Sequence, residues 1–178
     1  MGSAHKDFSA KKSVNDLRAI SGLDKAETIR KEGAPIPMKP MKRWDDGKAL
    51  LVSGDAAGVV APASGEGIYY AMLCGRLSAD AIKEFLVTGK ASALRAPRKR
   101  FMKLHGRTFF ALGLLQYFWY HSDKRREQFV EMCKDEDVQT LTWQAYTQKK
   151  LVKKKKKEHL RVFIKDVAQL LGLSKTAA

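Results

Sequence analysis

Two short stretches rich in small residues are the places where this sequence could bind a ligand. The first, Gly54-Asp55-Ala56-Ala57-Gly58, follows an apolar run at residues 49–52 and contains a single carboxylate. The second, Gly65-Glu66-Gly67, begins a stretch with helical periodicity. Small residues allow close backbone approach to a ligand, and the free amides of a helix N-terminus favour electron-rich groups. Asp55 could accept hydrogen bonds from ligand hydroxyls.

The same residues also have purely structural interpretations. Asp55 could simply cap a tight turn, and a helix N-terminus stabilises any carboxylate placed where Glu66 stands. Tyr69 and Tyr70 could form aromatic walls for an apolar ligand, but their helical spacing also suits ordinary core packing. The order of apolar strand, small-residue turn, second glycine pair and helix is more specific than any of these residues alone.

The elements expected around these motifs change in kind along the chain. The apolar run at residues 49–52, which follows a turn, predicts a buried strand, and a further strand is expected at residues 27–32. Helical spacing predicts a short helix capped by Ser9, a helix over about 65–87, a long helix opened by Pro97, a helix beginning near Asp137 and a helix over 158–171. We therefore predict an α+β region over residues 1–94 and a mostly helical region over residues 95–178.

The net charge of +15 is concentrated in the second half of the chain. Lysines are densest from Lys149 to Lys157, next to an amphipathic stretch at residues 158–171. This arrangement suits an anionic membrane surface, and it is equally compatible with a solvated lysine run. Nucleic-acid binding is the weaker alternative, because the lysine run contains no aromatic residues for base stacking. The apolar stretch at residues 109–120 is too short to span a bilayer.

Cysteine and histidine placement predicts neither a disulfide framework nor a metal site. Cys74 and Cys133 lie far apart, each without a neighbouring cysteine, and we interpret both as reduced thiols of a cytosol-like compartment. The histidines lack metal-ligand spacing: His5, His105, His121 and His159. The first eight residues have no targeting character.

Residues 54–71 (GDAAGVVAPASGEGIYYA) resemble the second FAD signature of the geranylgeranyl reductases. The similarity extends to Gly2-Ser3-Ala4-His5-Lys6, to Glu32-Gly33-Ala34-Pro35-Ile36-Pro37 and to His159-Leu160-Arg161. It implies the C-terminal part of a flavoprotein fold of the hydroxybenzoate-hydroxylase type, followed by a mostly helical cap. It also implies an oxidoreductase that uses FAD and NADPH to saturate double bonds of a geranylgeranyl group. The product would be a phytyl group, on a chlorophyll or bacteriochlorophyll ester or on a diphosphate.

The resemblance assigns cofactor and substrate roles to named positions but no catalytic residue. Tyr69 and Tyr70 are candidates for the prenyl-binding wall. The candidate FAD contacts are Gly54, Asp55, Ala56, Gly58, Gly65, Glu66, Gly67 and Ile68. The implied location is peripheral, on the cytoplasmic side of a photosynthetic membrane. The alternative is a basic module that binds nucleic acid or a membrane surface without catalysis.

One part of the family pattern is missing from this sequence. Family members begin with a strand and a Gly-x-Gly-x-x-Gly turn that holds the ADP half of FAD, and no such unit precedes Met1. Gly65-Glu66-Gly67 lacks the third glycine of that fingerprint. We therefore expect a parent protein with an N-terminal half that is absent here, and poor FAD binding and no turnover by the chain alone.

Overall fold

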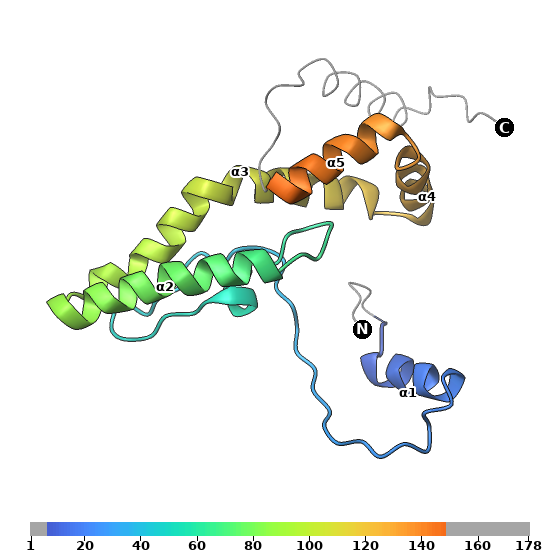
Figure 1. The fold of residues 1–178 in the computed structure, drawn as a ribbon, viewed down its shortest axis with the longest axis horizontal. Helices are drawn as coiled ribbons and strands as arrows, with labels where there is room; N and C mark the ends of the chain where they lie inside the picture. Colours follow the sequence, from blue (N-terminus) through green and yellow to red (C-terminus); the bar gives the residue numbers. More distant parts are fainter. Residues whose placement is uncertain (1–6, 149–178) are drawn as a thin grey trace. The chain divides into compact units, whose positions relative to one another are not determined.

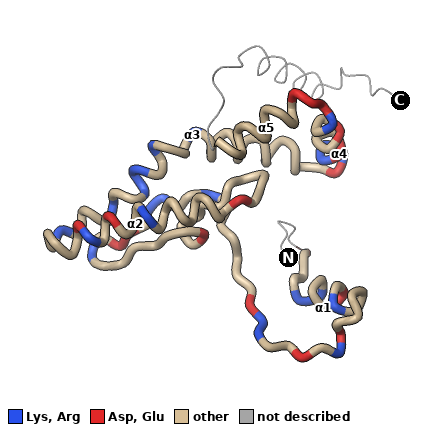
Figure 2. The backbone as a smooth tube through the Cα atoms, in the orientation of Figure 1, with Lys and Arg blue, Asp and Glu red and all other residues tan. Residues whose placement is uncertain are grey.

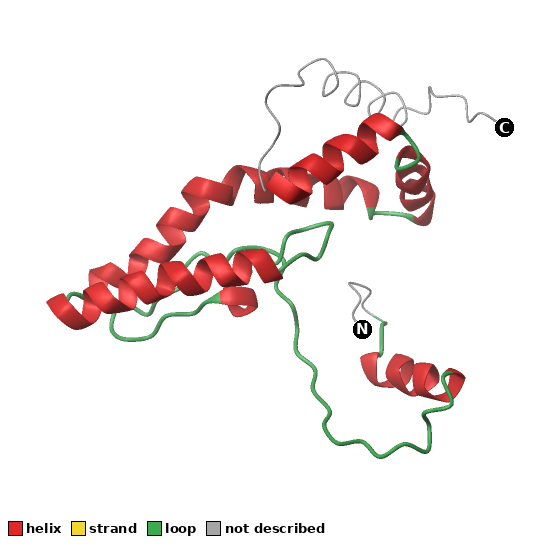
Figure 3. Ribbon diagram, in the orientation of Figure 1, coloured by secondary structure: helices red, strands yellow, loops and turns green. Residues whose placement is uncertain are grey.

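The computed structural model describes residues 7–148, and the chain divides into two compact units between Pro35 and Ile36. In these residues every regular element is helical (Figures 1 and 3). The elements are α1 (Ala10–Ile20), η1 (Gly54–Ala57), α2 (Ile68–Thr88), η2 (Ala91–Arg95), α3 (Ala96–Trp119), α4 (Asp123–Met132) and α5 (Glu136–Gln148). The predicted division into a region of residues 1–94 and a region of residues 95–178 stays a prediction.

The first unit contains α1, which confirms the helix predicted after Ser9. The Ser9 hydroxyl accepts a hydrogen bond of 3.3 Å from the amide of Lys12, and Gly22 follows the helix with a positive φ of 67°. No residue of α1 is buried. The strand predicted at residues 27–32 is wrong, because these residues are exposed and pair with no neighbouring strand in the described chain.

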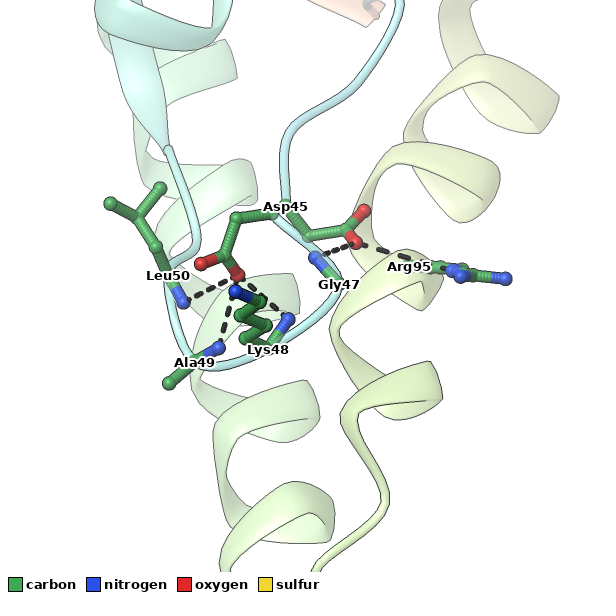
Figure 4. Close-up of polar contacts among 7 residues, drawn as sticks. Asp45, Gly47, Lys48, Ala49, Leu50 and Arg95 are labelled. Carbon is green, nitrogen blue, oxygen red and sulfur yellow. Dashed lines mark hydrogen bonds and ion pairs between the residues drawn. The ribbon is translucent and has the colours of Figure 1, made fainter.

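The apolar run at residues 49–52 ends a turn and contains a single bridging residue, Leu51, and it does not form the predicted strand (Figure 4). One carboxylate oxygen of Asp46 accepts hydrogen bonds from the amides of Lys48, Ala49 and Leu50 at 2.8–3.0 Å. These amides, those of Leu50 and Lys48 above all, hold the pKa of Asp46 below its ordinary value. Because these amides donate to Asp46, they are not available for pairing with a strand. The strand pairing here is limited to one isolated bridge between Asp45 and Leu51. The α+β class is therefore not found in residues 7–148.

Helices α2 and α3 pack together and carry the core of the second unit (Figure 1). Helix α2 also packs against η1 and η2. The cluster of buried side chains consists of Trp44, Ala57, Val59, Ala61, Tyr70, Cys74, Leu77, Phe101 and Phe109. Phe101 lies at its centre, with ring centroids 5.4 Å from Trp44 and 5.3 Å from Phe109. The turn and η1 are thus held against the beginning of α2 by shared apolar burial.

The helical predictions for the second unit are largely confirmed. Pro97 stands at the beginning of α3, and α5 begins one residue before the predicted position. The sequence does not predict α4, because that helix buries no residue and has no apolar face. Its cap is visible nonetheless, since the Ser122 hydroxyl accepts a hydrogen bond from the amide of Arg125. The helix predicted over 158–171 and the lysine run lie outside the described residues.

The apolar second half of α3 is only partly covered. Phe109 and Trp119 are buried, whereas Phe110 is 75% exposed. Leu114 and Leu115 are also exposed. Between residues 7 and 148, no helix combines the length and apolarity needed to cross a membrane.

Candidate functional site

A crevice of about 340 Å³ lies where the two small-residue stretches meet, at the beginning of α2. The residues that line it are Ile36, Asp55, Val60, Gly65, Gly67, Ile68 and Ala71. Four of them, Asp55, Gly65, Gly67 and Ile68, are predicted cofactor contacts. The structure therefore brings together residues of both stretches, as the sequence pattern predicts.

Asp55 is positioned by the single 3₁₀ turn of η1. Gly54 opens that turn with a positive φ of 65°, and Ser53 before it is extended. The Asp55 side chain is exposed, and its carboxylate lies against Gly67. A β-carbon at position 67 would lie 3.0 Å from Oδ1 of Asp55 and 3.3 Å from Cγ2 of Val60. Glycine at this position thus leaves room for the carboxylate beside the N-terminus of α2.

The beginning of α2 presents backbone amides to the crevice. Gly67 is the N-cap residue of this 21-residue helix, and glycine has no side chain that could accept a hydrogen bond from the first amides. Glu66 supplies one instead, because its Oε1 accepts a hydrogen bond of 2.9 Å from the amide of Tyr69. The described residues provide no acceptor for the amides of Gly67 and Ile68. These two donors and the positive end of the helix dipole favour an electron-rich ligand.

The four other predicted cofactor residues are not among those that line the crevice: Gly54, Ala56, Gly58 and Glu66. Gly58 has a φ of 79°, and a β-carbon there would lie 2.1 Å from the carbonyl oxygen of Lys39. This glycine therefore permits two backbone segments to cross closely. Ala56 is exposed beside it, and Gly54 faces the Cβ of Ala71 at 3.6 Å. A contact with a cofactor stays a prediction for all eight of the predicted residues, those that line the crevice included.

The two candidate substrate-binding tyrosines lie in different environments. Tyr70 is buried in the core, with ring centroids 4.9 Å from Phe109 and 5.2 Å from His105. Burial, assisted by the charges of Glu66 and Tyr69, raises the pKa of Tyr70 to about 12. Tyr69 is 37% exposed and packs edge-on against Tyr70. A prenyl-binding role for either residue stays a prediction, and of the two the Tyr69 ring is the more accessible.

Two buried titratable groups belong to the core on and beside α2. His105 is buried against aromatic rings, and burial lowers the pKa of its imidazole. Its Nδ1, like Nε1 of Trp44, has no hydrogen-bond partner among the described residues. Burial also raises the pKa of the Cys74 thiol to about 11. Residues 7–148 contain no group of three His, Cys, Asp or Glu side chains placed to hold a metal.

The sequence reasoning misses a second depression, of about 690 Å³, at the beginning of α3. We call it the basic pocket, and it is lined by Lys42, Arg43, Asp45, Ser92, Arg95, Ala96, Arg98 and Lys99. The sequence could have indicated part of this pocket, because the i, i+3 and i+4 spacing of Arg95, Arg98 and Lys99 places them on one helical face. Their proximity to Lys42 and Arg43 is visible only in the fold.

Comparison with known proteins identifies relatives of the chain. It is 51% identical over 173 residues to the geranylgeranyl diphosphate reductase of Rhodobacter capsulatus, which aligns with 97% of this chain. The chain is a homologue of the geranylgeranyl diphosphate reductases. The chloroplastic geranylgeranyl diphosphate reductase of Nicotiana tabacum is 40% identical and aligns with 87% of the chain. The resemblance inferred from residues 54–71 is thus confirmed.

The relationship covers only part of these relatives. The chain spans 44% of the Rhodobacter protein and 34% of the tobacco protein. A more distant relative, the digeranylgeranylglycerophospholipid reductase of Methanocaldococcus jannaschii, is 29% identical over 61% of this chain and a quarter of its own length. No family model matches the chain, and no solved structure matches it.

Proposed function

We propose that this chain is part of a flavin-dependent reductase that saturates double bonds of a geranylgeranyl group. The observation that supports this most strongly is the crevice itself, where Asp55 and the N-terminus of α2 face the same space. The substrate is a geranylgeranyl ester of a chlorophyll-type pigment or free geranylgeranyl diphosphate. The homologues named geranylgeranyl diphosphate reductase support this substrate class.

The donors and acceptors of the crevice fit FAD. Asp55 would accept hydrogen bonds from ribityl hydroxyls, and the amides of Gly67 and Ile68 would donate to electron-rich groups such as the pyrophosphate or the edge of the flavin ring. Bound flavin supplies hydride transfer, with NADPH as the proposed electron donor. The exposed side chain of Ile68 would give this polar lining an apolar rim. Glu66, already engaged by the Tyr69 amide, stiffens the helix terminus.

A chimera provides the test, because the chain spans less than half of its Rhodobacter relative. This chain would replace the segment that it matches there, and the purified chimera would be assayed for bound FAD and for NADPH-dependent reduction of geranylgeranyl diphosphate. We expect flavin and turnover in the chimera, and weak flavin binding without turnover by the 178-residue chain alone. Tight stoichiometric FAD binding with turnover by the chain alone would contradict the proposed division of the cofactor site.

Asp55→Ala in the chimera tests the site assignment. Removing the carboxylate leaves the ribityl hydroxyls of bound FAD without their acceptor, which costs about 1–3 kcal/mol, so FAD retention should fall roughly five- to 150-fold. Glu66→Ala is the comparison variant, because it removes the neighbouring carboxylate that accepts a hydrogen bond from the Tyr69 amide, and it should weaken FAD retention less than Asp55→Ala does. Equal flavin occupancy in the unaltered chimera and its Asp55→Ala variant would refute the role of Asp55.

We also propose peripheral association with the cytoplasmic face of a photosynthetic membrane. The supporting observations are the lysine-rich sequence from Lys149 to Lys157 and the exposed apolar residues Phe110, Leu114 and Leu115 of α3. Flotation with anionic vesicles, at rising salt, measures this binding. Equal flotation with neutral vesicles would contradict an electrostatic contribution.

A further inference from the structure

The basic pocket joins cations from two separate segments of the second unit. Lys42 and Arg43 precede the turn that begins at Trp44, and Arg95, Arg98 and Lys99 stand at the junction of η2 and α3. The first half of α3 carries Lys and Arg, whereas its second half carries none (Figure 2). Positive charge therefore accumulates at one end of this helix.

A hydrogen bond fixes the two segments relative to each other. Nε of Arg98 donates to the carbonyl oxygen of Met41 at 2.8 Å, directly beside Lys42 and Arg43. The pocket is thus formed by the fold of the chain, without need of a ligand to gather its cations. Such preorganisation lowers the entropic cost of binding.

The charge of the pocket is mostly uncompensated. Five of its lining side chains are cationic, and Asp45 is the one carboxylate among them. Oδ1 of Asp45 already accepts a hydrogen bond from the amide of Gly47 at 3.0 Å and lies 4.0 Å from Nε of Arg95 (Figure 4). Among the described residues, the other four cations have no carboxylate within ion-pair distance.

The position of these cations is unfavourable for the helix that bears them. The N-terminus of α3 is the positive end of its dipole, and its first turn contains no acidic residue. Arg98 and Lys99 add positive charge there, where a carboxylate would be the stabilising choice. A bound anion would offset both the dipole and the mutual repulsion of the side chains.

We propose that the basic pocket binds a diphosphate group, free or carried by a lipid. Arginine guanidinium groups match phosphate oxygens in bidentate geometry, and Ser92 adds a hydroxyl donor to the lining. The volume of about 690 Å³ accommodates two linked phosphates. No aromatic side chain lines the pocket, so base stacking does not contribute there. The basic pocket shares no lining residue with the crevice. Where the carrier is geranylgeranyl diphosphate, the inference rests on the proposed function and adds a binding site to it; for any other carrier it goes beyond that function.

The experiment uses the full 178-residue chain and a pair of charge-matched variants. Isothermal titration calorimetry with inorganic pyrophosphate compares the wild type with Lys42→Gln/Lys99→Gln, which removes two exposed pocket lysines. Lys83→Gln/Lys124→Gln removes two exposed lysines outside the pocket and is the control. Circular dichroism verifies that both variants fold. We expect the pocket variant to bind pyrophosphate at least about tenfold more weakly, and the control to bind like the wild type.

A second arm distinguishes the source of the phosphate. Geranylgeranyl diphosphate, and phosphatidylcholine vesicles with and without diacylglycerol diphosphate, replace pyrophosphate in the same comparison. The proposal is supported if a probe loses binding in the pocket variant but not in the control. The probe that behaves in this way identifies the carrier of the diphosphate. The proposal is overturned if none of these probes binds, or if the control variant weakens binding as much as the pocket variant. Flavin content has no bearing on either result.

Discussion

The carboxylate of Asp55 and the backbone of Gly67 are so close that a β-carbon at position 67 would lie 3.0 Å from Oδ1 of Asp55. This contact joins the two small-residue stretches, η1 and the N-terminus of α2, into one crevice. The crevice therefore requires glycine at position 67, because a side chain there would displace the Asp55 carboxylate.

Gly67→Ala should displace the Asp55 carboxylate and destabilise the chain by about 1 kcal/mol, because the new methyl group also meets Val60 at 3.3 Å. Chemical denaturation measures the change. Gly75→Ala is the control, since a β-carbon there meets nothing within 4 Å inside α2 and should stabilise the helix by about 0.5–1 kcal/mol. In an Asp55→Ala background the cost of Gly67→Ala should shrink. An unchanged cost would show that the contact with Asp55 is not the cause.

Gly58→Ala should be far more damaging than Gly67→Ala. Its β-carbon would lie 2.1 Å from the carbonyl oxygen of Lys39, which is backbone and cannot rotate away. The φ of 79° adds strain for any residue with a side chain. We expect a loss of about 2 kcal/mol or more, measured as a fall in the denaturation midpoint. A midpoint equal to that of the wild type would show that the crossing of these segments relaxes freely.

Four helices, α1, α2, α3 and α5, are predictable from the sequence because their caps and apolar spacing are local features. Ser9 and Pro97 mark helix beginnings without reference to the rest of the chain. The strand predicted at residues 49–52 failed because strand pairing depends on a distant partner, while Asp46 offers the same amides an acceptor nearby. Local signals thus predict these four helices, but neither α4, which has no apolar face, nor the environment of each residue.

The crevice and the basic pocket also differ in how far they can be predicted from local sequence signals. The meeting of Asp55 and Gly67 is predictable because both stretches flank one short loop. The proximity of Lys42 to Lys99 depends on the packing of the chain over more than fifty residues. The burial of Tyr70 likewise depends on Phe101 and Phe109 of another helix.

The two cysteines should differ sharply in reactivity. Cys74 is fully buried and the pKa of its thiol is raised to about 11, whereas Cys133 is exposed. Since the thiolate is the reactive form, iodoacetamide at about pH 8 should modify Cys133 at least about tenfold faster. Peptide mass spectrometry of the native chain measures both rates. Cys133→Ser should remain almost unlabelled until denaturant is added, and rapid labelling of that variant in buffer would contradict the burial of Cys74.

His105→Phe should make the chain less sensitive to acid. Burial lowers the pKa of the imidazole below its ordinary value of 6.5, so the folded chain binds this proton less readily than the unfolded chain. Stability should consequently fall as the pH drops below about 6.5, and phenylalanine removes that contribution. Nδ1 of His105 is buried without a hydrogen-bond partner, and phenylalanine puts a carbon atom in its place. The new ring would lie among the rings of Tyr70 and Phe101.

The comparison requires denaturation curves of both proteins at about pH 7.5 and about pH 5. At the higher pH the variant should equal the wild type or exceed it by about 1 kcal/mol, because an unsatisfied buried polar atom is lost. At the lower pH the difference should widen in favour of the variant, since the wild type must then keep a neutral imidazole in an environment that excludes the proton. All other groups are common to the two proteins, so their contributions cancel in the difference. Parallel losses of stability with acid would show that His105 does not titrate differently in the folded and unfolded chain.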